Sequence, residues 1–228
     1  MIANVANIFT EGLYTLDQAA RLAQVSPRLM TAWLDGTQDR EPAVLRRIPP
    51  NQARIVGFID LIQALAIRAI RATRKLSLQK IRATINAAHE KGIDYPFARR
   101  HQTFLFADDV VIRLDFPEEI LIQVTGKYKH QQLLHAIVEP YLIDLSYDSQ
   151  GLAYEYSPLS DGEYKIVINP RKQYGAPIVL PIGYTVAALV NAYQGEGSLS
   201  GAAAAFGVNP TAVKLAVRYD DFLSGIPA

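Results

Sequence analysis

Residues 199–218 read LSGAAAAFGVNPTAVKLAVR, and this stretch decides how the C-terminal end of the chain folds. A helix-turn-helix needs small residues where its two helices cross and a turn that tolerates positive φ. Ala202 and Ala203 occupy the crossing, Gly207 occupies the turn, and Asn209 is an N-cap followed by a proline suited to the first helical turn. We therefore predict a helix-turn-helix here. Its remaining buried positions are Leu199, Phe206, Val208, Val213 and Ala216.

A similar pattern begins at Leu16, near the other end of the chain. Ala19 and Ala20 supply the small crossing, and Ser26 is an N-cap that is again followed by proline. Gln24 stands where the C-terminal unit has its turn glycine, so the N-terminal unit is the less regular of the two. Its apolar positions are Ala23, Val25, Met30 and Trp33.

The charge of the 228 residues is unevenly distributed, although the formal net charge is only +1. Residues 1–101 contain 15 Lys and Arg against 8 Asp and Glu, whereas residues 102–228 contain 8 against 14. Because a basic segment suits the phosphates of nucleic acids, this asymmetry predicts one end that faces nucleic acid and another that faces a different partner. Ordinary variation of the surface is the plainer interpretation.

The arginines favour the N-terminal unit as the DNA-binding one, because arginine holds phosphates and pairs with guanine in the major groove. The loop 40–47 lies where a wing would reach the adjacent DNA backbone. The C-terminal unit offers only Lys214 and Arg218, next to two aspartates, which favours dimerisation or docking of a partner. The predicted DNA contacts are Arg21, Ser26, Arg28, Thr31, Arg40, Arg46, Arg47 and Arg54.

Residues 1–101 form the first of three predicted domains and show the spacing of helices. Apolar residues recur at helical intervals across 15–34 and again across 51–76. Ser77 can cap a further helix, for which Gly92 is the stop signal.

Residues 102–169, the second predicted domain, change to the alternation of strands, most clearly at 164–168. They predict a small, mostly antiparallel sheet. Residues 170–228, the third predicted domain, begin with a Gly- and Pro-rich segment that we expect to form an extended hairpin, or clasp. Thr185 then opens a helix that precedes the C-terminal helix-turn-helix.

The residues that serve catalysis and metal binding are not arranged as sites. The chain has no cysteine, which excludes disulfides, zinc-thiolate centres and thiol catalysis. Its four histidines lack the spacing of zinc motifs, and adjacent carboxylates such as Asp108 and Asp109 point to opposite faces of a strand. We expect no enzyme activity, no cofactor and no metal. With no signal-peptide pattern and no apolar run of about 18 residues, we expect a cytoplasmic protein.

Residues 14–91 resemble the MerR-like DNA-binding domain. The motifs that carry this resemblance are YTLDQAA at 14–20, FIDLI at 58–62 and LSLQKIR at 76–82. The long C-terminal dimerisation helix and the effector-binding cysteines of MerR regulators are both missing. The resemblance therefore implies a winged helix-turn-helix without metal sensing.

The C-terminal part resembles a small domain of antitoxins from type II toxin–antitoxin systems. The matching motifs are IVINP at 166–170, GAPI at 175–178, TVAAL at 185–189 and the helix-turn-helix itself. The usual clasp carries a basic Gly-Thr-Arg-like stretch, whereas residues 180–184 read LPIGY, so that arginine's role is lost here.

Together the two resemblances are to the larger VapB-type antitoxins, which pair with a PIN-domain ribonuclease toxin. They imply an α+β fold with an N-terminal MerR-like winged helix-turn-helix, a central antiparallel sheet, and a C-terminal β-hairpin and helix-turn-helix bundle. They also imply a homodimer that binds operator DNA. A basic side chain suits the acidic site of a nuclease, and Arg171 and Lys172 are the predicted toxin-binding residues. Two alternatives stay open: a stand-alone MerR-like regulator whose β domain binds a ligand or partner, and a protein-interaction scaffold.

Overall fold

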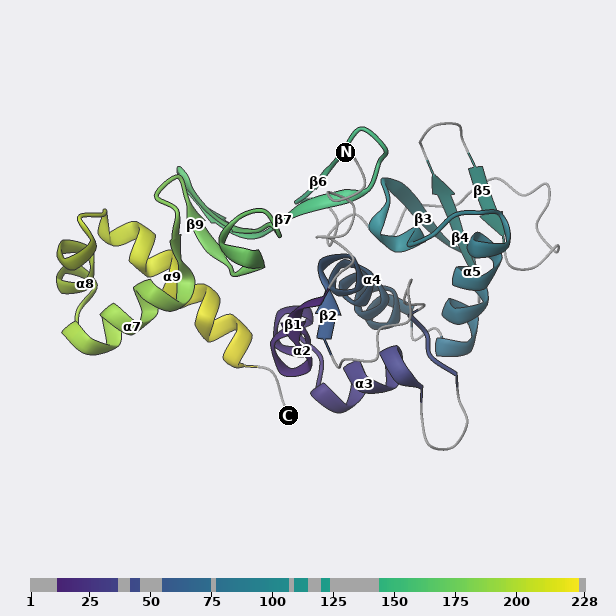
Figure 1. Cartoon of the computed structure of the whole chain (residues 1–228), viewed down its shortest axis with the longest axis horizontal. Helices are drawn as coiled ribbons and strands as arrows, with labels where there is room; N and C mark the ends of the chain where they lie inside the picture. Colours follow the sequence, from purple (N-terminus) through teal and green to yellow (C-terminus); the bar gives the residue numbers. More distant parts are fainter. Residues whose placement is uncertain are drawn as a thin grey trace.

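The structure is a computed structural model, which describes residues 12–36, 42–45, 55–74, 77–106, 109–114, 120–123 and 144–225. Side chains are described throughout these ranges except at residues 73–74 and 101–123. The elements form two lobes, which are connected by a long antiparallel sheet (Figure 1). None of the helices in these ranges combines the length and the apolar character that crossing a membrane requires.

The N-terminal lobe is built around one helix, α4 (Phe58–Arg74), whose residues from Phe58 to Ile67 are all buried. The helix-turn-helix predicted near the N-terminus is present as α2 and α3, and it packs on α4. Ser77 caps the next helix as predicted, and Gly92 follows that helix with a positive φ of 75°. The other elements of the lobe are β1 (Gly12–Thr15), α2 (Leu16–Ala23), α3 (Pro27–Asp35), β2 (Ile55–Gly57), α5 (Leu78–Glu90) and the 3-10 turn η1 (Pro96–Ala98).

The predicted helix across 51–76 is shorter than expected at its start. Residues 51–54 lie outside the described residues, and Ile55–Gly57 is a strand that pairs antiparallel with Gly12–Thr15. The prediction was wrong here because the spacing of apolar residues reports local periodicity, while this strand is fixed by a partner 40 to 45 positions away.

The strands of the predicted middle domain belong to two sheets rather than one. The first three strands form a separate antiparallel sheet in the order β3-β4-β5, with bounds β3 (His101–Phe106), β4 (Asp109–Leu114) and β5 (Ile120–Gln123). The second sheet has the order β10-β9-β8-β7-β6, so it continues from the middle segment into the clasp. Its strands are β6 (Leu145–Tyr147), β7 (Ala153–Asp161), β8 (Tyr164–Ile168), β9 (Ile178–Leu180) and β10 (Tyr184–Thr185).

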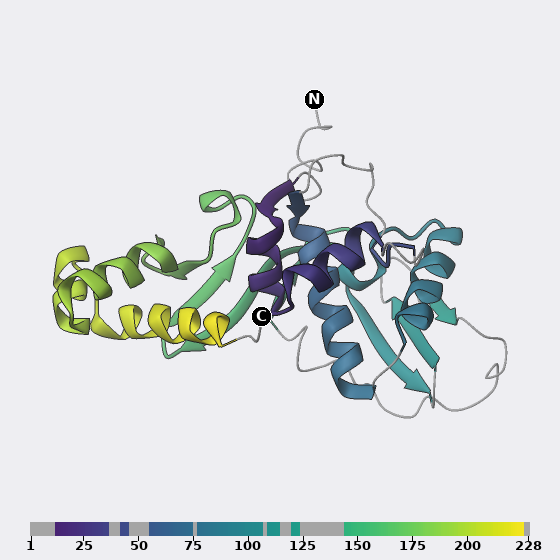
Figure 2. The same cartoon turned by 90° about the horizontal axis from the view of Figure 1, so that it is seen from below.

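The C-terminal lobe confirms the predicted turn chemistry. Thr185 caps α7 (Val186–Glu196), Ser198 caps α8 (Leu199–Phe206), and Gly207 takes the left-handed conformation at φ 62°. The last helix, α9 (Pro210–Ser224), packs along the sheet and also approaches α2 of the other lobe, as Figure 2 shows from below.

Candidate functional site

The N-terminal helix-turn-helix has well-formed helix ends. Thr15 and Gln18 form a reciprocal capping box at the start of α2, and the Ser26 Oγ accepts a hydrogen bond from the Leu29 amide at 3.2 Å at the start of α3. Ala19 and Ala20 are fully buried at the crossing, as predicted. Ser26, which the sequence offered as a DNA contact, therefore uses its side-chain oxygen to hold α3 in place.

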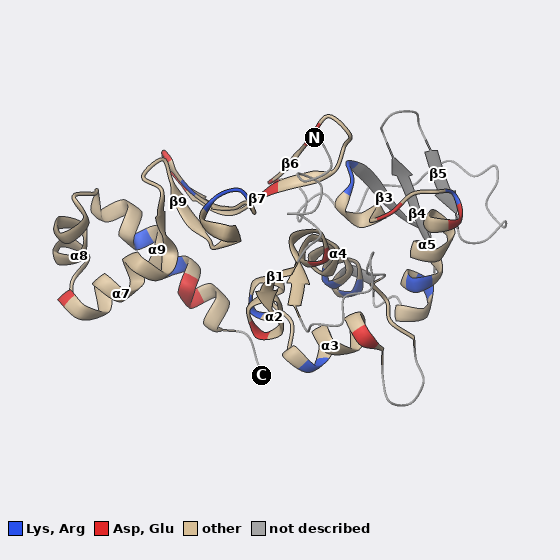
Figure 3. Cartoon of the chain, in the orientation of Figure 1, with Lys and Arg blue, Asp and Glu red and all other residues tan. Residues whose placement is uncertain are grey.

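The outward face of α3 carries two predicted DNA contacts. Arg28 is exposed, and within the described ranges no carboxylate forms an ion pair with it. Thr31 is half-buried, and its hydroxyl donates to the Pro27 carbonyl at 2.9 Å. In Figure 3 the ribbon of this helix is blue, for a basic residue, near its start and red, for the acidic Asp35, at its end. Arg28 is thus the exposed cation that α3 presents.

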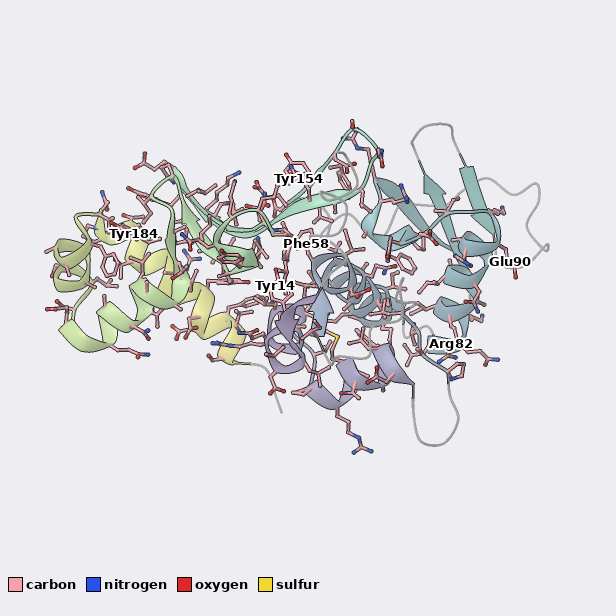
Figure 4. All side chains as sticks on the ribbon, viewed as in Figure 1. Tyr14, Phe58, Arg82, Glu90, Tyr154 and Tyr184 are labelled. Carbon is pink, nitrogen blue, oxygen red and sulfur yellow. The ribbon has the colours of Figure 1, made fainter. Side chains whose placement is uncertain are left out.

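Arg21 lies at the junction of the lobes instead of on α3. Its Nη2 is 2.8 Å from the Asp220 Oδ1 and donates to the Ser224 Oγ at 3.1 Å, which ties α2 to the last turns of α9. The Tyr14 hydroxyl, labelled in Figure 4, makes a second link by donating to the Gly175 carbonyl at 3.0 Å. Burial raises the pKa of Tyr14 well above its usual value, so the hydroxyl stays protonated as this bond requires.

The predicted wing falls largely outside the described residues. Arg40, Arg46, Arg47 and Arg54 all lie there, so their positions stay predictions. The described part, residues 42–45, is held against α3 because the Val44 and Leu45 amides both donate to the Trp33 carbonyl, at 2.8 and 2.9 Å. The Arg82 Nε, on α5, donates to the Ala43 carbonyl at 3.3 Å.

The C-terminal helix-turn-helix presents a weakly basic surface. Of its two predicted cations, Lys214 is exposed on α9, whereas the Arg218 Nη1 is 3.0 Å from the Asp161 Oδ2 at the end of β7. The outer side of α8 is uncharged, with Ser200, Ala204 and Ala205 exposed. This unit therefore has little charge to offer to phosphates, in keeping with the predicted role in protein contacts.

The part of the clasp that lies between β8 and β9, residues 169–177, is anchored on a buried carboxylate. The sequence did not reveal this carboxylate. Glu155, only 8% exposed, accepts hydrogen bonds on Oε2 from the Lys172 Nζ at 2.8 Å and from the Asn169 Nδ2 at 3.0 Å. The Lys165 Nζ is 3.9 Å from the other carboxylate oxygen. Burial alone would raise the pKa of Glu155, but these hydrogen bonds and the two lysine charges outweigh it and lower the pKa. Lys172, predicted to contact a toxin, is thus engaged within the chain.

This network predicts a pH-dependent stability. A carboxyl whose pKa is lowered by folding stabilises the native state above its unfolded pKa, and that stabilisation is lost as the pH falls through the folded value. We expect Glu155→Gln to reduce the free energy of unfolding at pH 7 by about 1 kcal/mol, a modest value because Lys172 is partly solvated. The deficit should begin to shrink below the ordinary glutamate pKa of about 4.3, where the carboxyl of the unfolded chain becomes protonated, and it should vanish once the folded carboxyl is protonated as well.

Urea unfolding at pH 7 and at pH 3 measures this difference. The exposed Glu196, at the end of α7, provides the matched control, and Glu196→Gln should leave the urea midpoint unchanged at both pH values. A Glu155→Gln deficit that is as large at pH 3 as at pH 7 would contradict the charge-based account.

The tip of the clasp is formed by Gln173, Tyr174 and Gly175, which all have positive φ values, of 46°, 52° and 78°. Tyr174 is 85% exposed, although it is a large aromatic residue. Arg171, the other predicted toxin contact, is exposed at the base of the tip, and its amide donates to the Asn169 Oδ1. Sequence reasoning missed Tyr174, and its position before a clasp glycine was the only signal available.

A recess of about 270 Å³ lies beside the tip, between the two lobes. Its apolar wall includes Leu13 and Leu22 from the N-terminal lobe and Val186 and Leu223 from the C-terminal lobe. The Arg21–Asp220 pair and Tyr174 are also part of its lining. In the described part of the chain, no three His, Asp or Glu side chains come together as a metal site. His89 instead pairs with Asp94 at 2.8 Å.

The molecule is thus an α+β protein with a helix-turn-helix in each of two linked lobes. No family model matches the chain. It is 25% identical over 230 aligned residues to a Mycobacterium tuberculosis protein named "Putative antitoxin VapB45", and the alignment covers 89% of this chain and 91% of that protein. Its fold is similar to the crystal structure of Rv2018 from Mycobacterium tuberculosis, with a TM-score of 0.63 and 18% identity over 92% of this chain and 99% of that one. The structural likeness extends over both lobes.

Proposed function

We propose that this chain is an antitoxin that neutralises a PIN-domain ribonuclease toxin and represses its own operon by binding operator DNA. The observation that carries the proposal is the similarity along almost the whole chain to a protein named as an antitoxin. The exposed Arg28 on α3 and the exposed clasp tip at the lobe junction also support it. Helix α3 would bind DNA and the clasp would hold the toxin.

The DNA-binding end of the proposal rests on α3. Its N-terminus is capped by Ser26, its buried face packs through Met30 and Trp33, and Arg28 is exposed on the opposite side. A homodimer would place two such helices in successive major grooves, which is how helix-turn-helix proteins gain affinity and specificity. The arginines of the predicted wing would add contacts to the flanking phosphates.

The toxin-binding end rests on the clasp. Arg171 is exposed there, and the cations Lys165 and Lys172 lie on either side of the buried Glu155 carboxylate. A surplus of positive charge at this point complements the acidic site of a nuclease, and occlusion of that site would stop RNA cleavage.

The first test is co-expression with the product of the adjacent reading frame. We expect that frame to encode a PIN-domain ribonuclease, which arrests growth alone and co-purifies with this chain in an inactive complex. A neighbour without nuclease character, together with operator binding that needs no partner, would favour a stand-alone regulator instead.

Charge reversal at Arg28 tests the DNA-binding end. We expect Arg28→Glu to weaken binding to the promoter region of its own operon by at least 30-fold, because a major-groove cation is replaced by an anion that phosphates repel. The mobility shift is measured at two salt concentrations, so that loss of a phosphate contact also appears as a shallower salt dependence. The matched control is Lys214→Glu on the exposed side of α9, which should bind within threefold of the wild type. The reverse ranking would assign DNA binding to the C-terminal unit.

A further inference from the structure

The tip of the clasp is held in a conformation that its residues do not favour. Three consecutive residues, Gln173 to Gly175, lie in the left-handed region, and two of them carry side chains. Left-handed backbone at a residue with a Cβ is unfavourable and persists only where the surroundings impose it. Such strain is concentrated at sites that present a group to a ligand or partner. Neighbouring contacts must therefore impose this conformation on the tip. The conformation is also one that suits the presentation of a side chain to a ligand or partner.

Several contacts hold the tip from behind. Asn169 sits between the Glu155 carboxylate and the Arg171 amide, so it connects the buried network to the base of the tip. The Gly175 amide donates to the Lys172 carbonyl at 3.0 Å, and the Gly175 carbonyl accepts from Tyr14 of the other lobe. The tip is thus held from both sides by contacts within the chain.

The fastened tip projects an aromatic side chain into solvent beside a hollow. Tyr174 is 85% exposed, more than the other exposed large apolar residues of the described ranges, which are Ile55, Tyr184 and Phe222. The recess of about 270 Å³ begins next to it and has apolar walls from both lobes. An exposed tyrosine adjoining an apolar hollow has the composition of an interface hot spot, since tyrosine buries a large area at little cost in conformational entropy.

We propose that Tyr174 anchors the toxin, and that the recess beside it receives an apolar side chain of the toxin. This inference rests on the proposed antitoxin function and specifies where the complex forms. The matching face of the toxin would offer an apolar pocket rimmed by carboxylates, because Arg171 is exposed at the base of the tip and two lysines, Lys165 and Lys172, lie around the Glu155 carboxylate. Lys172 is a positioning residue in this arrangement, because its ammonium is bound to Glu155.

The location of the recess has a further implication for the complex. Because its walls come from both lobes, a toxin side chain in the recess would contact α2 of the DNA-binding unit as well as α9. The toxin would therefore rest on the junction that the Arg21–Asp220 pair closes.

Isothermal titration calorimetry of Tyr174 variants with purified toxin tests whether Tyr174 anchors the toxin. We expect Tyr174→Ala to raise the dissociation constant of the complex at least 30-fold. Tyr184→Ala removes a tyrosine that is 41% exposed in the same lobe and packs on Phe206, and it should change affinity less than threefold. Tyr174→Gly is the second variant, because glycine accepts the left-handed backbone and should keep or raise the melting temperature while binding as weakly as Tyr174→Ala.

The recess is tested separately by filling it. Ala187 lines the recess and is exposed, so Ala187→Trp fits without disturbing the core and should weaken toxin binding at least tenfold. Ala204→Trp on the exposed side of α8 is the matched control and should bind as the wild type does. Toxin binding that survives Ala187→Trp unchanged would remove the recess from the interface.

The positioning role of Lys172 predicts a specific pattern of coupling. Glu155→Gln and Lys172→Gln should both weaken toxin binding, the second more strongly because it also removes a cation, and the double variant should be no weaker than Lys172→Gln, because both remove the same internal contact. Lys172→Arg, which retains a cation for Glu155, should restore binding. Additive effects in the double variant would instead indicate that Lys172 touches the toxin directly.

These outcomes separate the inference from the proposed function. If the wild-type chain forms no complex with the toxin, the antitoxin proposal itself fails. If the wild type binds tightly and both Tyr174→Ala and Tyr174→Gly bind equally tightly, the antitoxin proposal stands and the assignment of Tyr174 is overturned.

Discussion

Replacement of Gly175 by alanine is expected to lower the free energy of unfolding by about 3 kcal/mol, because three unfavourable effects coincide at this position. The backbone has a φ of 78°, which costs a residue with a Cβ about 1 kcal/mol. The added methyl group would overlap the Tyr14 hydroxyl. Moving that hydroxyl breaks its bond to the Gly175 carbonyl inside a buried junction, which costs about 1–2 kcal/mol more.

Gly183→Ala is the matched control for this experiment. Gly183 has nearly the same φ, 80°, but a Cβ there would meet no atom within 4 Å. It should therefore show only the backbone cost, about 1 kcal/mol. Urea unfolding of both variants isolates the contribution of the lobe junction as the difference between them, and equal losses would mean that the junction contributes nothing. Tyr14→Phe should reduce the penalty of Gly175→Ala, since it removes the atom that collides.

The second large effect is expected at Phe58, the first residue of α4, which is 0% exposed. Phe58→Ala should reduce the free energy of unfolding by about 4 kcal/mol, since it removes a large buried ring and leaves a cavity in the core of the N-terminal lobe. Figure 4 shows Phe58 close to the centre of the molecule, where β2 passes into α4.

Phe222 offers the same substitution on the surface. It lies on α9, is 53% exposed, and should lose less than about 1 kcal/mol as Phe222→Ala. Thermal and chemical unfolding of the two variants compare the loss of the same aromatic ring at a buried position and at an exposed one. Losses within about 1 kcal/mol of each other would show that Phe58 does not organise the core.

Local chemistry made several helix ends predictable from the sequence. Ser26, Thr185 and Asn209 each cap a helix through the side-chain oxygen that the sequence indicated, because capping depends on residues two or three positions away. Gly207 takes the predicted positive φ for the same local reason.

Contacts between distant residues could not be predicted in this way. Gln24 occupies the turn of the N-terminal unit with a φ of 55°, and its side chain accepts a hydrogen bond from Arg68, which lies 44 positions away on α4. The pairing of β1 with β2 is equally remote. Local periodicity contains no information about which distant segment will complete a turn or a sheet.

The sequence allowed candidate site residues to be chosen by residue type. It did not show which of their side chains are exposed and which are ion-paired. The clasp was located correctly as a connecting segment, and Arg171 is exposed in it. Lys172 and Arg21 were chosen for their charge, yet both are ion-paired, with Glu155 and Asp220. Tyr174 carried no charge and no motif, and only the fold shows that its side chain is exposed at a strained tip.

The junction of the lobes also limits how this protein can diverge. Tyr14 and Gly175 are 161 positions apart, and the residues of the Arg21–Asp220 pair are 199 apart, yet each pair is a single contact with one half in each lobe. A recombination event that exchanges one lobe for that of a relative would separate both pairs at once. Chimeric chains should therefore be less stable than the parent unless the incoming lobe brings residues that restore both contacts.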